Sequence, residues 1–329
     1  MESATAVRPV PHRPWLHLTL FALTVATTSF TFDKAFPSGP LPPLERLAHA
    51  LTFSAALLSI LGAHEMGHYA LARWHGVDVS LPYFIPLPYL GVGTMGAVIR
   101  IRAPIPTRNA LVDIGAAGPL AGLVVALPLL CWGLAHSEWI AAPPATGSSF
   151  AGSTSLWSLG RLGVEWAAAR LAHAPPLPEE AFYGHQALIL SDSLLMRGLK
   201  ALVLGPLPPG TDIQEHPVVI AGWFGLMVTM LNLMPVGQFD GGHMAHALLG
   251  RHARWVGRGV VLVLLFLTLF YTVTWLFWSL VAAKLVGLGH PEVTHPGEPL
   301  GFGRKVVCAL CFLALAGCAM PVPIRMVIW

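Results

Sequence analysis

The chain has 329 residues, of which 55% are hydrophobic and only 11% are charged, and its formal net charge is +3. Soluble domains usually carry about 25% charged residues, so this composition excludes an ordinary soluble protein. The small net charge gives no reason to expect a nucleic-acid partner. Several apolar runs reach the roughly 20 residues that one crossing of a bilayer requires. The composition therefore predicts a polytopic membrane protein embedded in a lipid bilayer.

In chain order, six apolar segments are expected to form transmembrane helices: 15–32, 47–74, 110–135, 217–234, 259–287 and 305–320. The segment 259–287 is too long for one upright helix and too short for two, so we expect one tilted or broken span. Residues 77–107 are rich in proline and β-branched side chains, which favours a small membrane-associated β-hairpin. The expected fold class is an all-α polytopic membrane protein with about six transmembrane helices.

A long polar region, residues 136–216, separates the third and fourth helices. Prolines interrupt it repeatedly, and its pattern offers no convincing series of strands. Within it, residues 188–204 are amphipathic and are expected to lie on the membrane surface. No PDZ-like module is recognisable in this region, which the orientation of the helices places on the extracytoplasmic side.

Arginines near the helix ends predict the orientation, because basic residues in short loops favour the cytoplasmic side. The arginines expected there are Arg8, Arg13, Arg73, Arg100, Arg102, Arg108, Arg251, Arg254, Arg258 and Arg325. The short loops on the other side hold fewer basic residues: Lys34, Arg46, Arg304 and Lys305. Both termini are then cytoplasmic. The Gly-, Pro- and Ala-rich composition favours a bacterial plasma membrane.

Residues His64-Glu65-Met66-Gly67-His68 form an H-E-x-x-H motif inside the second apolar segment. Residues four apart share one face of a helix, so both imidazoles can reach one zinc ion. Glu65 then lies beside that face as a candidate general base. Three ionisable groups in a membrane helix are costly unless they are paired, bind a metal or line a wet cavity. The motif therefore predicts one zinc ion per chain, against the alternative of a chance pair of histidines.

A catalytic zinc usually has three protein ligands, and the best candidate for the third is Asp240. Pro235 and Gly237 break the fourth helix just before it, and Asp240 is the sole acidic residue between positions 215 and 292. A broken helix at membrane depth is tolerated where it lines a cavity. His243 and His246 are the rival ligands.

These motifs resemble the site-2 protease family of intramembrane zinc metalloproteases. The resemblance covers about residues 47–250 and rests on the H-E-x-x-H motif, the glycine-rich segment 113–122 and the stretch 232–242, in that order; segment 96–102 also looks like the family. It implies a three-helix catalytic core with the metal near the cytoplasmic face. By resemblance, the ligands are His64, His68 and Asp240, and Glu65 is the general base.

The resemblance also implies a domain organisation and a substrate class. Residues 1–46 would be the N-terminal segment and first helix, 47–250 the catalytic core, and 251–329 the C-terminal helices. Asn232 would bind substrate or polarise the scissile carbonyl. The expected substrates are single-span, membrane-tethered regulatory proteins, cut in or near their transmembrane segments by a zinc-activated water.

A substrate helix has all its backbone groups hydrogen-bonded internally, so it must unwind before cleavage. Residues 95–102 alternate and contain β-branched side chains, which predicts a strand whose free edge could pair with an unwound substrate. The candidate substrate-binding residues are Gly96, Ala97, Val98 and Ile99, together with Asn232. The alternative is a plain hairpin beneath the core.

Polar and small residues in the third helix have simpler explanations. Gly115, Gly118 and Gly122 are expected to allow close packing against the helix with the H-E-x-x-H motif. Asp113 is expected to pair with nearby Arg108 or to cap the helix start.

Two other classes of function compete with the protease. A metal or proton transporter would also place histidine and aspartate in its helices, but would distribute them along a path. A catalytically inactive membrane scaffold would be free to lose Glu65. The motif and its glutamate together favour the enzyme.

Overall fold

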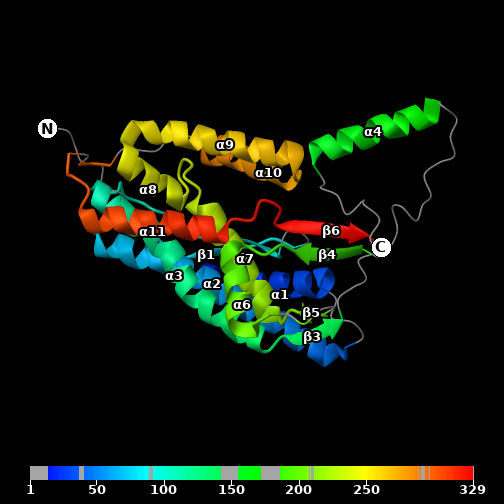
Figure 1. Cartoon of the computed structure of the whole chain (residues 1–329). Helices are drawn as coiled ribbons and strands as arrows, with labels where there is room; N and C mark the ends of the chain where they lie inside the picture. The colour runs from blue at the N-terminus through cyan, green and yellow to red at the C-terminus, as the bar shows by residue number, and fades with distance from the viewer. Residues whose placement is uncertain are drawn as a thin grey trace.

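The structure is a computed structural model of the chain (Figure 1). It describes residues 14–36, 41–88, 92–141, 155–171, 186–206, 208, 211–287, 289, 293–295 and 297–328. Predictions that fall on residues 1–13, including Arg8 and Arg13, lie outside the described residues. The same is true of positions 142–154 and 172–185 of the polar region.

Three helices that pack against one another form the centre of the molecule: α2 (Pro43–Trp74), α3 (Arg108–Ala135) and α7 (Pro217–Leu233). Thr107 caps α3, because its hydroxyl accepts a hydrogen bond from the Ala110 amide. Small residues bring α2 and α3 close together. A Cβ atom on Gly67 would overlap the carbonyl of Ala117, so the helix backbones touch at this point. The expected group of three central helices is present.

Two further elements lie beside this centre on the N-terminal side. Helix α1 (Pro14–Ala35) packs against α2, and strands β1 (Tyr83–Pro86) and β2 (Thr94–Val98) form an antiparallel hairpin that contacts α1. The register pairs Tyr83 with Val98. The predicted hairpin between the second and third helices is confirmed.

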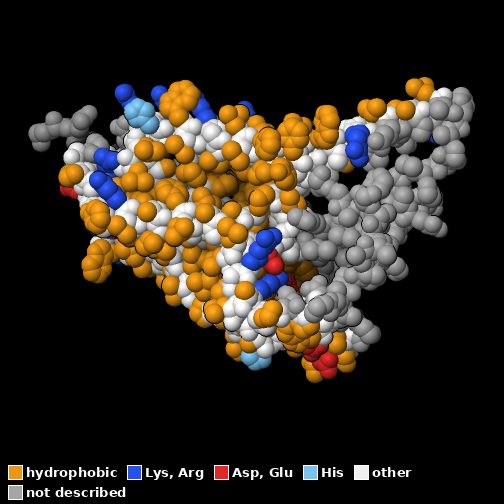
Figure 2. All heavy atoms as spheres, viewed as in Figure 1, with side chains coloured by type: hydrophobic (Ala, Val, Ile, Leu, Met, Phe, Trp, Pro, Cys, Tyr) orange, Lys and Arg blue, Asp and Glu red, His pale blue; other side chains and the backbone are white. Residues whose placement is uncertain are grey.

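The lengths and hydropathies of the helices identify an integral membrane protein. Four described stretches are long and apolar enough to cross a bilayer: Pro14–Ala35, Pro43–Trp74, Arg108–Ala135 and Asp240–Phe270. The last contains α8 (Asp240–Leu249), a short 3₁₀ turn and α9 (Ala253–Phe270), and the apolar helix α7 is shorter than these four. Hydrophobic side chains are spread widely over the described surface on the face seen in Figure 2. The all-α polytopic class is confirmed, whereas the count of six spans is not.

The predicted segment 259–287 is broken. Helix α9 ends at Phe270, α10 (Thr274–Leu280) follows after a turn and packs against α9, and a π-helical turn (Val281–Val286) completes the segment. Helix α11 (Phe302–Cys318) then returns to the centre and contacts α3 and α7.

The polar region contains more regular structure than its pattern predicts. It holds α4 (Leu156–Leu171) and α6 (Leu194–Leu204), and strands β3 (Glu138–Ala141), β4 (Gln186–Leu190) and β5 (Thr211–Gln214). The pattern offered no convincing series of strands, because β3 pairs with β5 across some 70 residues of sequence and no local turn signal marks such a pair. The predicted amphipathic stretch 188–204 is the end of β4 followed by α6.

The C-terminal strand corrects the predicted topology. Strand β6 (Ile324–Ile328) pairs with β4, with Arg325 opposite Ile189. The C-terminal strand therefore lies on the same side as the polar region. The prediction that placed Arg325 and the C-terminus on the opposite side was wrong, because the broken segment after α9 reverses the chain once more than expected.

We expect His216 to make the stability of this fold dependent on pH. Its Nδ1 caps α7 by accepting a hydrogen bond from the Val218 amide at 3.2 Å. Burial lowers the pKa of His216, and neighbouring His49 and His136 lower it further. The folded protein then binds fewer protons than the unfolded chain, so the free energy of unfolding falls as the pH drops through the ordinary value of 6.5.

The variant His216→Asn should lose part of this decline, since asparagine caps a helix but does not titrate. Melting temperatures of the detergent-solubilised chain, compared between about pH 7 and pH 5, measure the effect. An equal decline in the wild type and the variant would contradict this role for His216.

Candidate metal centre

Helix α2 presents His64 and His68 on one face, as their spacing predicts. Both side chains are buried, with 4% and 7% of their surface exposed, and their Nε2 atoms lie 3.1 Å apart. The two Nε2 atoms therefore point to one place beside helix α2.

Helix α3 fixes the orientation of His68. The ring Nδ1 lies 2.7 Å from the carbonyl oxygen of Ile114, so Nδ1 is the protonated nitrogen and Nε2 is left with its lone pair facing the site. The ring fits because position 118 is a glycine. A Cβ atom on Gly118 would overlap the imidazole of His68, whereas one on Gly122 would lie 3.4 Å from Cβ of His64, an ordinary contact. The predicted close packing of α3 against α2 is therefore a cradle for the two imidazoles.

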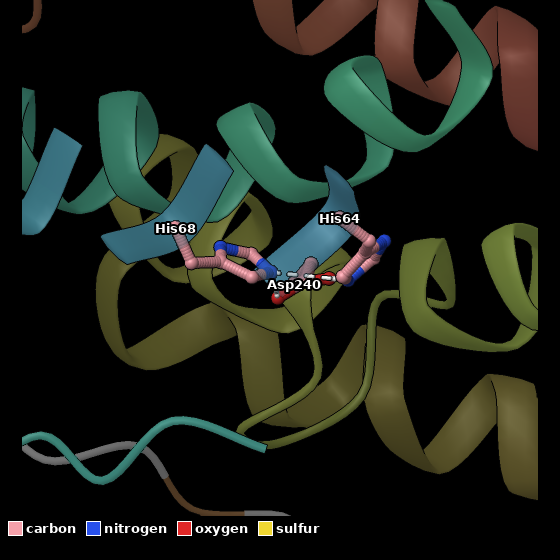
Figure 3. Close-up of side chains that lie close together, drawn as sticks. All are labelled: His64, His68 and Asp240. Carbon is pink, nitrogen blue, oxygen red and sulfur yellow. Dashed lines mark hydrogen bonds and ion pairs between the residues drawn. The ribbon is translucent and has the colours of Figure 1, made fainter. Parts of the chain in front are cut away.

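Asp240 reaches the same point from the broken helix. Helix α7 ends at Leu233, and Asp240 is the first residue of α8. Its Oδ2 lies 3.3 Å from Nε2 of His64 and its Oδ1 lies 3.3 Å from Nε2 of His68. Figure 3 shows the carboxylate between the two rings. The break is tight, since a Cβ atom on Gly241 would overlap the carbonyl of Leu233.

The donor set fits a zinc ion. The ligand atoms of His64, His68 and Asp240 lie within 4.8 Å of one another. Oδ2 of Asp240 is buried and has no hydrogen-bond partner among the described residues, which is costly for a carboxylate unless a cation is present. Two imidazoles and one carboxylate are a donor set used by catalytic zinc sites, which keep a fourth position open.

The rival ligands His243 and His246 are not part of this group of three. His243 instead packs its Cβ against Gly115 of α3, at the distance expected for a tight helix contact. The geometry therefore favours Asp240 as the third candidate ligand.

Two further predicted residues border the site. Asn232, near the end of α7, places Nδ2 3.1 Å from Nε2 of His64. Glu65 is 92% buried, and the backbone of Ile99 lies close to its carboxylate. This proximity of Glu65 to the hairpin was not predicted from the sequence, since nothing local links position 65 to position 99.

The predicted strand lies next to the site. Gly96, Ala97 and Val98 belong to β2, and Ile99 directly follows it. Within the described residues, β2 pairs only with β1, so its second edge has no strand partner there. The strand therefore ends beside Glu65.

The prediction for Asp113 was wrong. Its carboxylate pairs with Arg304 of α11 at 2.7 Å and with His75, after the end of α2, at 2.9 Å. The guanidinium of Arg108 instead donates to the carbonyl of Ala247 on α8. Sequence proximity favoured Arg108, but the fold brings a residue 191 positions away into contact.

The fold and the site together define an integral membrane protein with a buried His-His-Asp centre of the zinc-peptidase type. Residues 52–272 match the profile of Peptidase family M50, more than half of the chain. The chain belongs to this family, which is the site-2 protease family expected from the motifs.

The curated relatives that the chain matches are named as zinc metalloproteases. The chain is 29% identical over 261 residues to "Probable zinc metalloprotease EGY2, chloroplastic" of Arabidopsis thaliana, covering 79% of this chain and 39% of the relative. It is 31% identical over 230 residues to "Probable zinc metalloprotease EGY1, chloroplastic" of Oryza sativa subsp. japonica, covering 69% and 33%. The chain thus spans between about a third and a half of the length of the curated relatives it matches. No solved structure matches it.

Proposed function

We propose that the chain is an intramembrane zinc metallopeptidase that cuts peptide bonds in or near transmembrane segments. The observation that carries this proposal is the meeting of His64, His68 and Asp240 around one point, with Glu65 beside it, inside helices apolar enough to span a membrane. Membership of family M50 supports the same chemistry.

In this mechanism His64, His68 and Asp240 would hold the metal. When bound, zinc supplies Lewis acidity, which lowers the pKa of a bound water to about 7 and polarises a carbonyl. Glu65 takes a proton from the attacking water on its carboxylate and returns it to the leaving amine. Asn232, whose Nδ2 lies 3.1 Å from Nε2 of His64, donates a hydrogen bond to the developing oxyanion.

The open edge of β2 is the proposed binding place for the unwound substrate. An extended peptide can add to such an edge through main-chain hydrogen bonds. The proximity of the Ile99 backbone to Glu65 supports this placement, because a peptide paired along residues 96–99 passes directly in front of the candidate base. A plain hairpin with no substrate role remains the alternative interpretation.

The competing functions fit the geometry less well. A transporter needs ionisable groups spaced along a path, whereas the described candidate ligands lie at one depth within 4.8 Å. An inactive scaffold has no need for a buried glutamate beside the metal ligands, and burying a carboxylate costs free energy.

Removal and return of the metal test the proposal. Isolated membranes containing the chain should release soluble protein fragments, measured by mass spectrometry. With 1,10-phenanthroline, fragments that depend on this chain should fall by about 100-fold, and added Zn²⁺ should restore them. Membranes with the Asp240→Asn chain control for other metallopeptidases. Fragments unchanged by chelation, or Zn²⁺ flux into sealed vesicles without cleavage, would refute the peptidase.

The substrates are proposed to be single-span regulatory proteins. The named relatives are chloroplastic, so they give no support to the predicted bacterial plasma membrane. The membrane that holds this chain and the cytoplasmic placement of its metal centre stay predictions, which protease protection of tagged loops in sealed membranes would check.

A further inference from the structure

A groove of about 630 Å³ runs between α1 and α2, well away from the metal centre. Both helices contribute one face to it, at helical spacing. Its lining residues are Ala22, Val25, Ala26, Ser29, Phe30 and Asp33 of α1, and Pro43, Arg46, Leu47, Ala50 and Leu51 of α2. The groove is therefore apolar along most of its length and charged at one end.

One polar group in the groove lacks a partner. The hydroxyl of Ser29 is buried, with the residue 8% exposed, and has no hydrogen-bond partner among the described residues. The neighbouring Thr28, by contrast, bonds to Ser54 across the helix contact. A buried hydroxyl without a partner is costly, so a hydrogen bond from Ser29 to a polar atom of a ligand would offset this cost.

The charged end of the groove favours an anionic group. Arg46 binds both carboxylate oxygens of Asp33 through Nε and Nη2, and its Nη1 has no hydrogen bond within the described part of the chain. Lys34 lies 3.9 Å from the same carboxylate with 64% of its side chain exposed. Two basic groups thus share one acidic partner. Lys34 and the exposed Glu45 both lie outside the lining of the groove, but the ion pair with Asp33 keeps Lys34 at its mouth.

We infer that this groove binds one anionic glycerophospholipid. An acyl chain lies along the apolar floor, the Ser29 hydroxyl donates to an ester carbonyl, and Lys34 and Arg46 hold the phosphate one helical turn further along α1. The order of these groups along α1 matches the order of groups in the lipid, because a glycerolipid carries its ester groups between its acyl chains and its phosphate.

The volume of about 630 Å³ lies in the range of small-molecule pockets, about 300–1,000 Å³. A bound lipid would hold α1 against the start of α2, the helix that carries His64 and His68 at its other end.

The test uses the purified full-length chain in detergent with two probes, dioleoyl phosphatidylglycerol and dioleoyl phosphatidylcholine. Native mass spectrometry should show one tightly bound phosphatidylglycerol, held about fivefold more tightly than phosphatidylcholine because of one net positive charge at the mouth. Lys34→Gln should remove this preference. Ser29→Ala should weaken both lipids by about fivefold, since their ester groups are the same.

A bulky substitution provides the matched comparison. Ala26→Phe fills the groove and should weaken phosphatidylglycerol by about tenfold. Val124→Phe adds the same ring on α3 at a position that is 71% exposed and outside the groove, and should change nothing. An equal loss of phosphatidylglycerol binding in both variants, or no loss in either, would mean that lipid binds non-specifically over the surface. Either result would overturn the proposed site. Should Ala26→Phe not fold, Lys34→Gln and Ser29→Ala decide, since neither adds bulk. Lower cleavage by Ala26→Phe with unchanged lipid binding would also overturn it, in favour of a peptide occupant.

Discussion

The Glu65→Gln chain is expected to keep its metal and to lose peptide-bond cleavage by about 10³-fold. Glutamine has the shape of glutamate but cannot accept a proton, and general-base catalysis contributes roughly 10²–10⁴-fold. The carboxylate is not among the three candidate ligands, so metal binding should not depend on it. Cleavage is measured as soluble fragments released from membranes, and metal content as zinc per chain in the purified protein.

The two readings of this variant are separable because zinc content and cleavage are measured on the same preparation. Loss of cleavage together with zinc would make Glu65 a ligand or a structural residue. Retained cleavage would remove Glu65 from the mechanism and, with it, the hydrolytic assignment. The Asn232→Ala chain should show a smaller loss than Glu65→Gln, because removal of one hydrogen-bond donor to the oxyanion lowers the cleavage rate by about 10²-fold.

The metal centre could be predicted from the sequence because its strongest signal is local. His64 and His68 share a helix face by spacing alone. Asp240 is some 170 residues away, but its position at a helix break, as the sole acidic residue in a long apolar stretch, identified it without a contact map. A carboxylate in that environment needs a cation, and the helix break supplies the place for one.

Pairings between distant polar residues could not be predicted in the same way. Asp113 was assigned to Arg108, five positions away, yet it pairs with Arg304. Strand β4 likewise pairs with β6, more than 130 positions later. Neither partner leaves a periodic or local trace in the sequence, because both depend on how α10 and α11 return after the break at Phe270. The apolar pattern predicts where helices lie in the sequence, but it does not predict in which direction each helix runs or which neighbours it meets.

Gly118→Ala is expected to lower the affinity for zinc by about 100-fold or more while the chain still folds. The added Cβ would overlap the imidazole of His68, and the ring, as the far end of a side chain, can swing away at small cost to the fold. That movement breaks its contact with the Ile114 carbonyl and removes one ligand atom. Loss of an outer-shell partner alone costs about 10–100-fold in metal affinity. Competition with a chromogenic zinc chelator measures the change.

Gly122→Ala is the matched control, since it makes the same chemical change one turn later on the same face of α3. Its Cβ would lie 3.4 Å from Cβ of His64 and 3.5 Å from Nδ1, distances of normal van der Waals contact. Alanine also favours a helix over glycine by about 1 kcal/mol, so neither variant should lower the helix content measured by circular dichroism. If both variants bind zinc as the wild type does, His68 has room to bind metal from another position, and the cradle formed by Gly118 does not determine the site. A difference between them would show that the space at residue 118 holds His68 in place for the metal.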